Sequence, residues 1–397
     1  MGRVFKLDLQ KFEDAIKHSG KDVSVFFGGV FDGLKNKISA EFPHQKILVL
    51  CAKNEQNEYK DLVTALTDSG VKPLVAVLNA QPISIERVSP LFTYPEDVRA
   101  VVCFNTELLD YAYYYAQVKG VKLYLAVTRL DCVNLLRTSI RIKNGNYLEE
   151  IKVSPSISVV FDQEKIRAIN DGDKSAYESA ISLALALVEY RLMRVIKNKR
   201  TYKEAYTLIK ECVTETFDIT SYSREDRRVA LAYYTLLASV ANYASYGEIL
   251  KDTTFSACLE SRERASVLDV STKVLALAKL IFVDKKRVKN VPNYLERAEF
   301  LAENFGIDRA QAFSNFLVTS KLYKAHQKQI SNFFSDCAIE IDGIIKSLIT
   351  AKRIANNLTD GAKESTPSEN AIKYLGDLSK NLNICAFLRE AGVLEQI

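Results

Sequence analysis

Histidine, the commonest protein ligand for transition metals, is scarce in this sequence. The 397 residues include three histidines, His18, His44 and His326. None of them stands three or four residues from another, the spacing that brings two metal ligands to one helix face. The sequence also indicates no cysteine–histidine or serine–histidine pairing. A catalytic centre built on histidine is therefore not predicted.

Cysteine, proline and glycine are used sparingly as well. Seven cysteines are scattered without the short spacings of metal or redox motifs. Several lie in apolar runs such as Ile47–Cys51, where cysteine behaves as a small buried hydrophobe; this use is typical of a reducing compartment. Eight prolines and fifteen glycines are too few to indicate long linkers or disorder.

Long apolar runs are missing. No run reaches the ~18 residues that a membrane-spanning helix needs, and the N-terminus lacks the apolar core of a signal peptide. We therefore expect a cytoplasmic protein with no membrane contact. The net charge of +5 is spread along the chain, and we expect no nucleic-acid partner. The basic stretch 191–200 is interpreted as the solvated face of a helix, with an anionic partner as the alternative.

The pattern of the chain changes near residue 162. Before it, short apolar runs alternate with amphipathic segments such as 59–69 and 107–119, which is typical of buried parallel strands joined by helices. The predicted strands are Val23–Phe27, Ile47–Cys51, Leu74–Leu78, Ala100–Phe104, Leu123–Val127 and Ile157–Phe161. Asn144-Gly145 between two extended segments predicts a hairpin.

After residue 162 apolar residues recur with a helical period. The predicted helices are 174–197, 225–246, 262–283, 294–304, 309–330, 335–358 and 368–391. A chain of this length exceeds what one hydrophobic core usually supports. The sequence therefore predicts an α/β domain with a mostly parallel, Rossmann-like sheet over residues 1–162 and an all-helical domain over residues 163–397.

Short motifs in a fixed order resemble those of the dehydroquinate synthase-like superfamily. Pro95–Val102 resembles the strand before its glycine turn, Gly120 to Thr128 resembles a later strand, Asn144–Asp162 resembles the passage that ends in an aspartate, and Gly392-Val393-Leu394 resembles its C-terminal ending. That superfamily includes the iron-containing alcohol dehydrogenases, and the chain is most similar to glycerol-1-phosphate dehydrogenase. The resemblance implies an α/β half followed by a helical half.

The cofactor positions implied by this resemblance are Phe104, Asn105, Thr106, Asp110 and Thr128. Asp110 and Thr128 match the pattern of active members. The first three depart from it, because they stand where active members have glycines, whose bare backbone can approach a pyrophosphate at a helix N-terminus. We expect Phe104 to block that approach, with its ring packed on the sheet or filling the former cleft, and Glu107 to repel a phosphate. Tyr113 occupies the position of a lysine.

The implied metal positions depart in the same direction. The aspartate position falls on Ser179, the first histidine position falls within the histidine-free stretch 246–260, and the second falls on Ser261. Glu178 could replace the aspartate only if the alignment shifted by one residue. Arg262 and Arg264 would disfavour a cation, and a divalent metal would otherwise polarise the substrate hydroxyl. We expect no metal at this site.

Two further motifs that contact the substrate in active members are changed. The serine-to-glycine run after Thr128 reads Asp131, Val133 and Asn134, and a C-terminal Arg-Tyr-Thr motif falls on 381–383. The framework of the superfamily is thus present, while the glycine turn, the metal positions and the substrate motifs depart from its pattern. Because a fold does not imply an activity, the departures favour loss or alteration of catalysis.

The leading hypothesis is a diverged, non-catalytic or altered relative of glycerol-1-phosphate-type dehydrogenases, without a cofactor, that binds a small anionic ligand between its domains. The arginines that would bind the anion are Arg129, Arg137, Arg141, Arg262 and Arg264. One alternative is an active NAD(P)-dependent oxidoreductase that uses a divalent metal and acts on glycerol phosphate or a similar polyol. Another is a protein-interaction scaffold, and homo-oligomerisation is left open.

Overall fold

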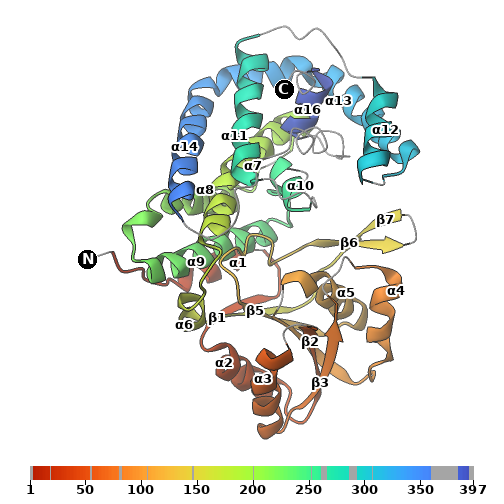
Figure 1. The fold of residues 1–397 in the computed structure, drawn as a ribbon, viewed down its shortest axis with the longest axis vertical. Helices are drawn as coiled ribbons and strands as arrows, with labels where there is room; N and C mark the ends of the chain where they lie inside the picture. Colours follow the sequence, from red (N-terminus) through yellow and green to blue (C-terminus); the bar gives the residue numbers. More distant parts are fainter. Residues whose placement is uncertain are drawn as a thin grey trace. The chain divides into compact units, whose positions relative to one another are not determined.

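The structure is a computed structural model in which a subset of the 397 residues is described. The described residues are 3–17, 19–53, 56–79, 83–104, 106–144, 147–199, 201–251, 253–260, 266–285, 293–305, 307–358 and 383–392. The chain forms two compact units (Figure 1). The sheet unit comprises residues 1–172 and 219–247, and the helical unit comprises 173–218 and 248–397. The sequence predicted a single domain boundary at residue 162. The observed division differs, because residues 219–247 belong to the sheet unit.

Six parallel strands form the sheet in the order β1-β8-β5-β4-β2-β3. The strands are β1 Val23–Phe27, β2 Lys46–Ala52, β3 Lys72–Leu78, β4 Val98–Cys103, β5 Lys122–Val127 and β8 Ile157–Phe161. Each coincides with a strand predicted from its apolar run. The predicted hairpin is also present, as β6 Ser139–Asn144 paired antiparallel with β7 Tyr147–Lys152, while Gly145 lies outside the described residues.

Helices cover the sheet on both faces. In the sheet unit they are α1 Gln10–Ile16, α2 Val30–Glu41, α3 Gln56–Asp68, α4 Ile85–Val88, α5 Leu109–Lys119, α6 Gln163–Arg167 and α9 Arg224–Ala244. The crossovers through α2 and α3 run toward the β3 edge, whereas those through α4 and α5 run back toward β1. Because parallel crossovers are right-handed, α2 and α3 cover one face and α5 covers the other (Figure 1).

Strand alternation decides which side chains meet α2 and α3. Successive side chains of a strand point to opposite faces, and one residue in two from the central strands joins the core beneath these helices. The contributors from the strands include Ile47, Val49, Cys51, Ala100, Val102, Tyr124 and Ala126. Both faces are buried in the central strands, which explains why these strands appear in the sequence as continuous apolar runs.

The helical unit is built around α7, a helix of 25 residues. Its helices are α7 Asp173–Lys197, α8 Lys203–Phe217, α10 Thr254–Glu260, α11 Val267–Ala278, α12 Tyr294–Phe305, α13 Arg309–Asp336, α14 Ala338–Asn357 and α16 Ile384–Glu390. Helices α8, α10, α11, α13 and α14 all contact α7, which is therefore buried around most of its circumference. Helix α8 was not predicted, and the first part of the predicted helix 368–391 lies outside the described residues.

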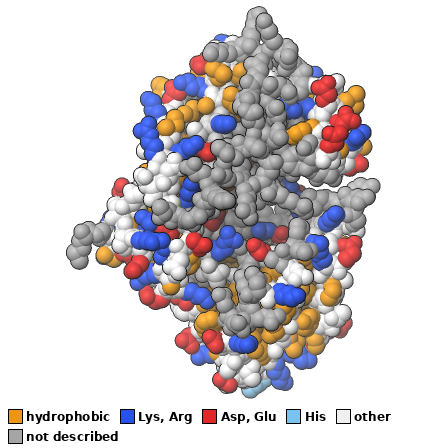
Figure 2. All heavy atoms as spheres, in the orientation of Figure 1, with side chains coloured by type: hydrophobic (Ala, Val, Ile, Leu, Met, Phe, Trp, Pro, Cys, Tyr) orange, Lys and Arg blue, Asp and Glu red, His pale blue; other side chains and the backbone are white. Residues whose placement is uncertain are grey.

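The distribution of charges on the surface and the burial of the cysteines are those expected from the amino-acid composition. Basic and acidic side chains are interspersed over the face shown in Figure 2. No described helix is long and apolar enough to cross a membrane. All seven cysteines are free thiols, and six of them are buried, as expected of cysteines used as small hydrophobes.

The end of α9 packs against the start of the β6–β7 hairpin through a residue that has no side chain. Gly247 has a φ of 74°, and a Cβ atom there would overlap the Thr138 hydroxyl. Gly120, which ends α5 with a φ of 64°, has no atom within 4 Å of the corresponding Cβ position. The two glycines share the left-handed conformation but not the close contact.

We expect Gly247→Ala to destabilise the protein more than Gly120→Ala. Both alanines lose roughly 1–2 kcal/mol in the left-handed conformation, and only the first adds a steric overlap, worth about 1–3 kcal/mol. Urea denaturation followed by circular dichroism measures the difference. Equal losses for the two variants would show that Thr138 can move away without cost.

Candidate functional site

The topology of the sheet unit identifies one position where a ligand would be expected. Strand β2 is followed by α3 on one face, and its neighbour β4 is followed by α5 on the other. Such a reversal opens a crevice beyond the carboxyl ends of the two strands, where doubly wound sheets bind their ligands. We call the carboxyl ends of β2 and β4 the switch point. Phe104 lies there, directly after β4.

Two aromatic rings pack against each other beside the switch point. Phe104 follows Ala100 and Val102 on the face that α2 and α3 cover, and it is buried in their core. Its ring lies 4.8 Å, centroid to centroid, from the ring of Tyr59 on α3. The phenylalanine therefore packs on the sheet, as expected, and acts as the last core residue of its strand.

The neighbouring cofactor positions are engaged in contacts within the protein. The Thr128 hydroxyl donates a hydrogen bond of 2.7 Å to the carbonyl oxygen of Phe104, which ties the end of β5 to the end of β4. Asp110, in the first turn of α5, forms an ion pair with Arg137. Thr106 begins the 3-10 turn that precedes α5, and Asn105 lies outside the described residues.

Tyr113, at the lysine position, is a buried structural residue. Its hydroxyl donates to the carbonyl of Leu135 at 3.0 Å and accepts from the backbone N–H of Arg137 at 3.1 Å. Burial raises the pKa of this phenol far above its usual value. The side chain thus fixes the loop before β6 to the inner face of α5, and sequence reasoning did not identify this role.

Helix α9 holds the other side of the same loop. The Thr235 hydroxyl donates to the carbonyl of Leu130 at 2.8 Å and accepts from the N–H of Cys132 at 3.0 Å. The Ser239 hydroxyl accepts from the N–H of Leu136 at 2.9 Å. The loop contains the positions 131, 133 and 134 that resemble a substrate motif, and its backbone is anchored by buried hydroxyl groups on both sides.

The metal positions lie in the helical unit. Ser179 is buried on α7, and its neighbour Glu178 accepts a hydrogen bond of 3.1 Å from the hydroxyl of Ser266. Ser261 lies outside the described residues. Within the residues that the structure describes, no group of three or more His, Cys, Asp or Glu side chains is arranged to hold a metal ion. No metal ligand set can therefore be assigned from this part of the chain.

A buried carboxylate organises the region instead. Glu189 on α7 accepts hydrogen bonds from the N–H and hydroxyl of Thr254, at 2.7 and 2.5 Å, and from the N–H of Ile384, at 2.9 Å. Thr254 is the first residue of α10 and Ile384 is the first residue of α16. Burial raises the pKa of Glu189 to about 7, although these three hydrogen bonds act to lower it.

The stretch 246–260, which resembles the region of the first histidine ligand, contains α10 and is thus joined to α7 through Glu189. The capping role of Glu189 was not predicted from the sequence, because the two helix starts lie 65 and 195 residues away.

Of the five arginines predicted to bind an anion, Arg129, Arg137 and Arg141 lie within the described residues. Arg137 is paired with Asp110, while Arg262 and Arg264 lie outside the described part of the chain. Arg129 is exposed just after β5, and Arg141 is exposed on β6. Two of the five predicted positions therefore remain unplaced, and one is neutralised by an acidic partner.

The basic stretch 191–200 is only in part the solvated face that was predicted, since Lys197 and Lys199 are exposed and Arg194 is buried. Arg191 donates to both carboxylate oxygens of Glu340, at 2.7 and 2.6 Å. Arg194 is buried, pairs with Glu248 at 3.0 Å, and lies over the ring of Tyr190 at 4.7 Å. The prediction was wrong for these two residues because their partners come from later helices and loops.

Of the C-terminal positions that resemble an Arg-Tyr-Thr motif, Asn383 is described and the other two are not. Asn383 is buried, and its side-chain oxygen accepts a hydrogen bond of 2.8 Å from the N–H of Ala386. It therefore caps the N-terminus of α16. This position performs a structural role next to the carboxylate of Glu189.

Comparison with known proteins identifies the fold. No family model and no curated protein matches the sequence. An iron-containing alcohol dehydrogenase from Thermococcus thioreducens superposes with a TM-score of 0.55 at 10% identity, covering 95% of this chain and 98% of that one. An archaeal alcohol dehydrogenase from a Red Sea brine pool gives 0.53 at 12% identity, over 95% and 97%. Maleylacetate reductase from a Rhizobium strain gives 0.51 at 11%, over 98% of each chain.

The chain therefore has the fold of the iron-containing alcohol dehydrogenases over nearly its whole length. A parallel sheet unit and a helical unit are what the resemblance of the short motifs implied. The likeness is one of fold, because fewer than one residue in seven is identical in these structures.

Loss of the Tyr113 hydroxyl should destabilise the sheet unit. Tyr113→Phe leaves the carbonyl of Leu135 and the N–H of Arg137 without their partner, which costs about 1–3 kcal/mol for buried groups. Tyr115→Phe is the matched control, since the Tyr115 hydroxyl is buried and has no hydrogen-bond partner within the described residues. Chemical denaturation should show a loss for the first variant and no loss or a gain for the second.

Titration of Glu189 should make stability depend on pH. Its folded pKa of about 7 lies above the ordinary value of 4.5, so the folded state retains the proton between these values. The resulting stabilisation is complete below about pH 4.5 and is lost as the pH rises through 7, a change of roughly 3 kcal/mol.

The glutamine in the variant Glu189→Gln does not titrate. The pH dependence of this variant's free energy of unfolding therefore reports all the other titrating groups. The free energy of unfolding of the wild type, measured in urea relative to this variant, should fall between pH 5 and pH 8. A difference that stays constant over that range would mean that the two helix N-termini keep the carboxylate ionised throughout.

Proposed function

We propose that this chain is a diverged relative of dehydrogenases with this fold, that it does not catalyse a nicotinamide-dependent reaction, and that it binds a small anionic ligand. The observation that carries the proposal is the Phe104–Tyr59 ring pair at the switch point. A dinucleotide bound there requires a turn whose backbone can approach the pyrophosphate. Here the turn begins with Phe104, whose side chain is buried in the core. The turn therefore contributes to packing and not to cofactor binding.

Electrostatics around the turn support the same proposal. Glu107 stands in the short 3-10 turn at the start of α5, where its negative charge opposes a phosphate near the helix N-terminus. Asp110 in the next turn is already paired with Arg137. The side chain at the lysine position, Tyr113, is uncharged and buried.

A small anion has one supporting feature in the sheet unit. Arg129 is exposed after Thr128 at the carboxyl end of β5, which is the edge of a parallel sheet where ligands bind. A guanidinium group there suits a phosphate or carboxylate. The size of the ligand is expected to be that of glycerol phosphate or inorganic phosphate rather than of a dinucleotide.

The second candidate is an NAD(P)-dependent oxidoreductase acting on glycerol phosphate or a similar polyol. The fold of the two alcohol dehydrogenases named above favours it. It requires a cofactor route that does not use the usual glycine turn, and a metal site that includes residues outside the described part of the chain. Binding measurements distinguish it directly from the first candidate.

Thermal shift and calorimetry with purified protein test both candidates. We expect no change in melting temperature with millimolar NADH or NADPH and none on addition of a chelator. Glycerol phosphate or inorganic phosphate should raise the melting temperature, because a ligand that binds only the folded state stabilises it. Arg129→Ala should weaken that effect, and Arg99→Ala, an exposed arginine at the other end of the sheet on β4, should not.

The same measurements can also favour the second candidate. Micromolar binding of a dinucleotide, together with about one zinc or iron per chain that is lost with stability on chelation, would reject the first candidate. It would establish the oxidoreductase as the function to pursue.

A further inference from the structure

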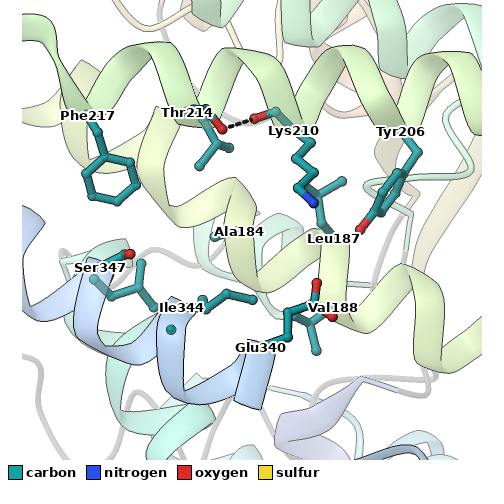
Figure 3. A pocket seen from close by; sticks show the side chains of 13 residues that line it. Ala184, Leu187, Val188, Tyr206, Lys210, Thr214, Phe217, Glu340, Ile344 and Ser347 are labelled. Carbon is teal, nitrogen blue, oxygen red and sulfur yellow. Dashed lines mark hydrogen bonds between the residues drawn. The ribbon is translucent and has the colours of Figure 1, made fainter. Parts of the chain in front are cut away.

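A cavity of about 250 Å³ lies within the helical unit, between α7, α8 and α14. Figure 3 shows side chains from the three helices converging on it. None of the positions that resemble the cofactor, metal or substrate motifs lines it. The cavity is partly open to solvent, and it is independent of the function proposed above.

Most of the lining is apolar. Leu187 and Val188 of α7 line it and are buried, and Leu348 of α14 also lines it. Phe217 of α8 lies at one end, and Ile344 of α14 lies across the cavity from α8 (Figure 3). An apolar group entering this space would be removed from water and would contact side chains on several sides. The burial of apolar surface is the main source of affinity in such a site.

Thr214 and Ser347 lie near Phe217, whereas the charged side chains and a tyrosine lie at the other end of the cavity (Figure 3). Tyr206 and Lys210 of α8 lie there with Glu340 of α14 (Figure 3). Glu340 is held by Arg191 through two hydrogen bonds from one nitrogen, so its charge is already compensated. Lys210 has no ion pair within the described residues, and it leaves this end with one positive charge in excess.

A glycine on α14 keeps the cavity open. Gly343 lies in the interior of the helix and lines the cavity, and a Cβ atom there would meet no atom within 4 Å. Its φ is not in the left-handed region, so neither backbone conformation nor close packing requires glycine. Glycine inside a helix costs about 0.5–1 kcal/mol relative to alanine.

We propose that this cavity binds a small monocarboxylate with an apolar chain or ring. The apolar part would occupy the space beside Gly343, and the carboxylate would bind the Lys210 ammonium and the Tyr206 hydroxyl. The single excess positive charge matches one carboxylate better than a phosphate dianion, and it repels amines. The volume lies just below the usual range of about 300–1,000 Å³ for drug-sized ligands, which favours a medium-chain acid.

The head group is tested with three probes of one chain length: octanoate, octanol and octylamine. Calorimetry and thermal shift on the full chain should show that octanoate binds at least tenfold more tightly than octylamine, with octanol between them. Lys210→Gln should lower the affinity for octanoate about tenfold and leave octanol unchanged. Lys203→Gln, on the same helix but outside the cavity lining, should change neither.

The space is tested at Gly343. Gly343→Leu should abolish binding of octanoate and octanol alike, without lowering the melting temperature, because leucine favours the helix more than glycine does. Thr350→Leu, an exposed position of α14 that does not line the cavity, is the control for added apolar surface. If Gly343→Leu does not fold, comparison of Lys210→Gln with Lys203→Gln still tests whether octanoate binds in this cavity.

Three outcomes would overturn the proposal. These are no octanoate binding at millimolar concentration, equal binding of octylamine and octanoate, and unchanged octanoate binding in both Lys210→Gln and a folded Gly343→Leu. Binding that follows the expected pattern would assign a carboxylate site to the helical unit whether or not phosphate or dinucleotides bind elsewhere.

Discussion

Each unit depends on one carboxylate that caps two helices at once. Asp162, after β8, accepts hydrogen bonds from the N–H of Val30 at the start of α2 and from Lys165 in α6, at 2.7 and 3.0 Å. Glu189 does the same for α10 and α16. The first N–H groups of a helix lack partners within it and carry a partial positive charge. One carboxylate therefore both satisfies those groups and fixes two helices in a defined relation.

These capping carboxylates bear on function because they hold helices in place through hydrogen bonds within the protein. In the helical unit Glu189 attaches α10, the helix in the stretch that resembles a metal-binding region, directly to α7. In the sheet unit Thr128 and Tyr113 hold the ends of β5 and α5 to neighbouring backbone. The described framework thus has internal bonds at the places where a cofactor or metal would contribute contacts.

The sequence predicts the sheet well and the site only in part. All six strands are found because each is a compact apolar run. Both faces are buried in the four central strands β8, β5, β4 and β2, and the edge strands β1 and β3 are apolar runs as well, although they are partly exposed. Helix α8 was missed because Val213, Thr214 and Thr216 lower its helix propensity, although its buried residues 209, 212, 213 and 216 follow a helical period. The packing of Phe104 followed from its place at the end of a predicted strand. The partners of Arg137, Arg191 and Glu189 did not, because they come from segments far apart in the chain and no local pattern specifies them.

Phe104 connects packing and binding in a single residue. It continues the alternation of Ala100 and Val102, so its ring enters the core beneath α3, and the same ring packs against Tyr59 beside the switch point. Replacing it with a small residue would reopen the turn but leave a cavity that costs about 3–5 kcal/mol. A typical domain is stable by only about 5–15 kcal/mol. The packed turn is therefore coupled to the stability of the sheet unit, and a glycine turn could be restored only with compensating changes around Tyr59.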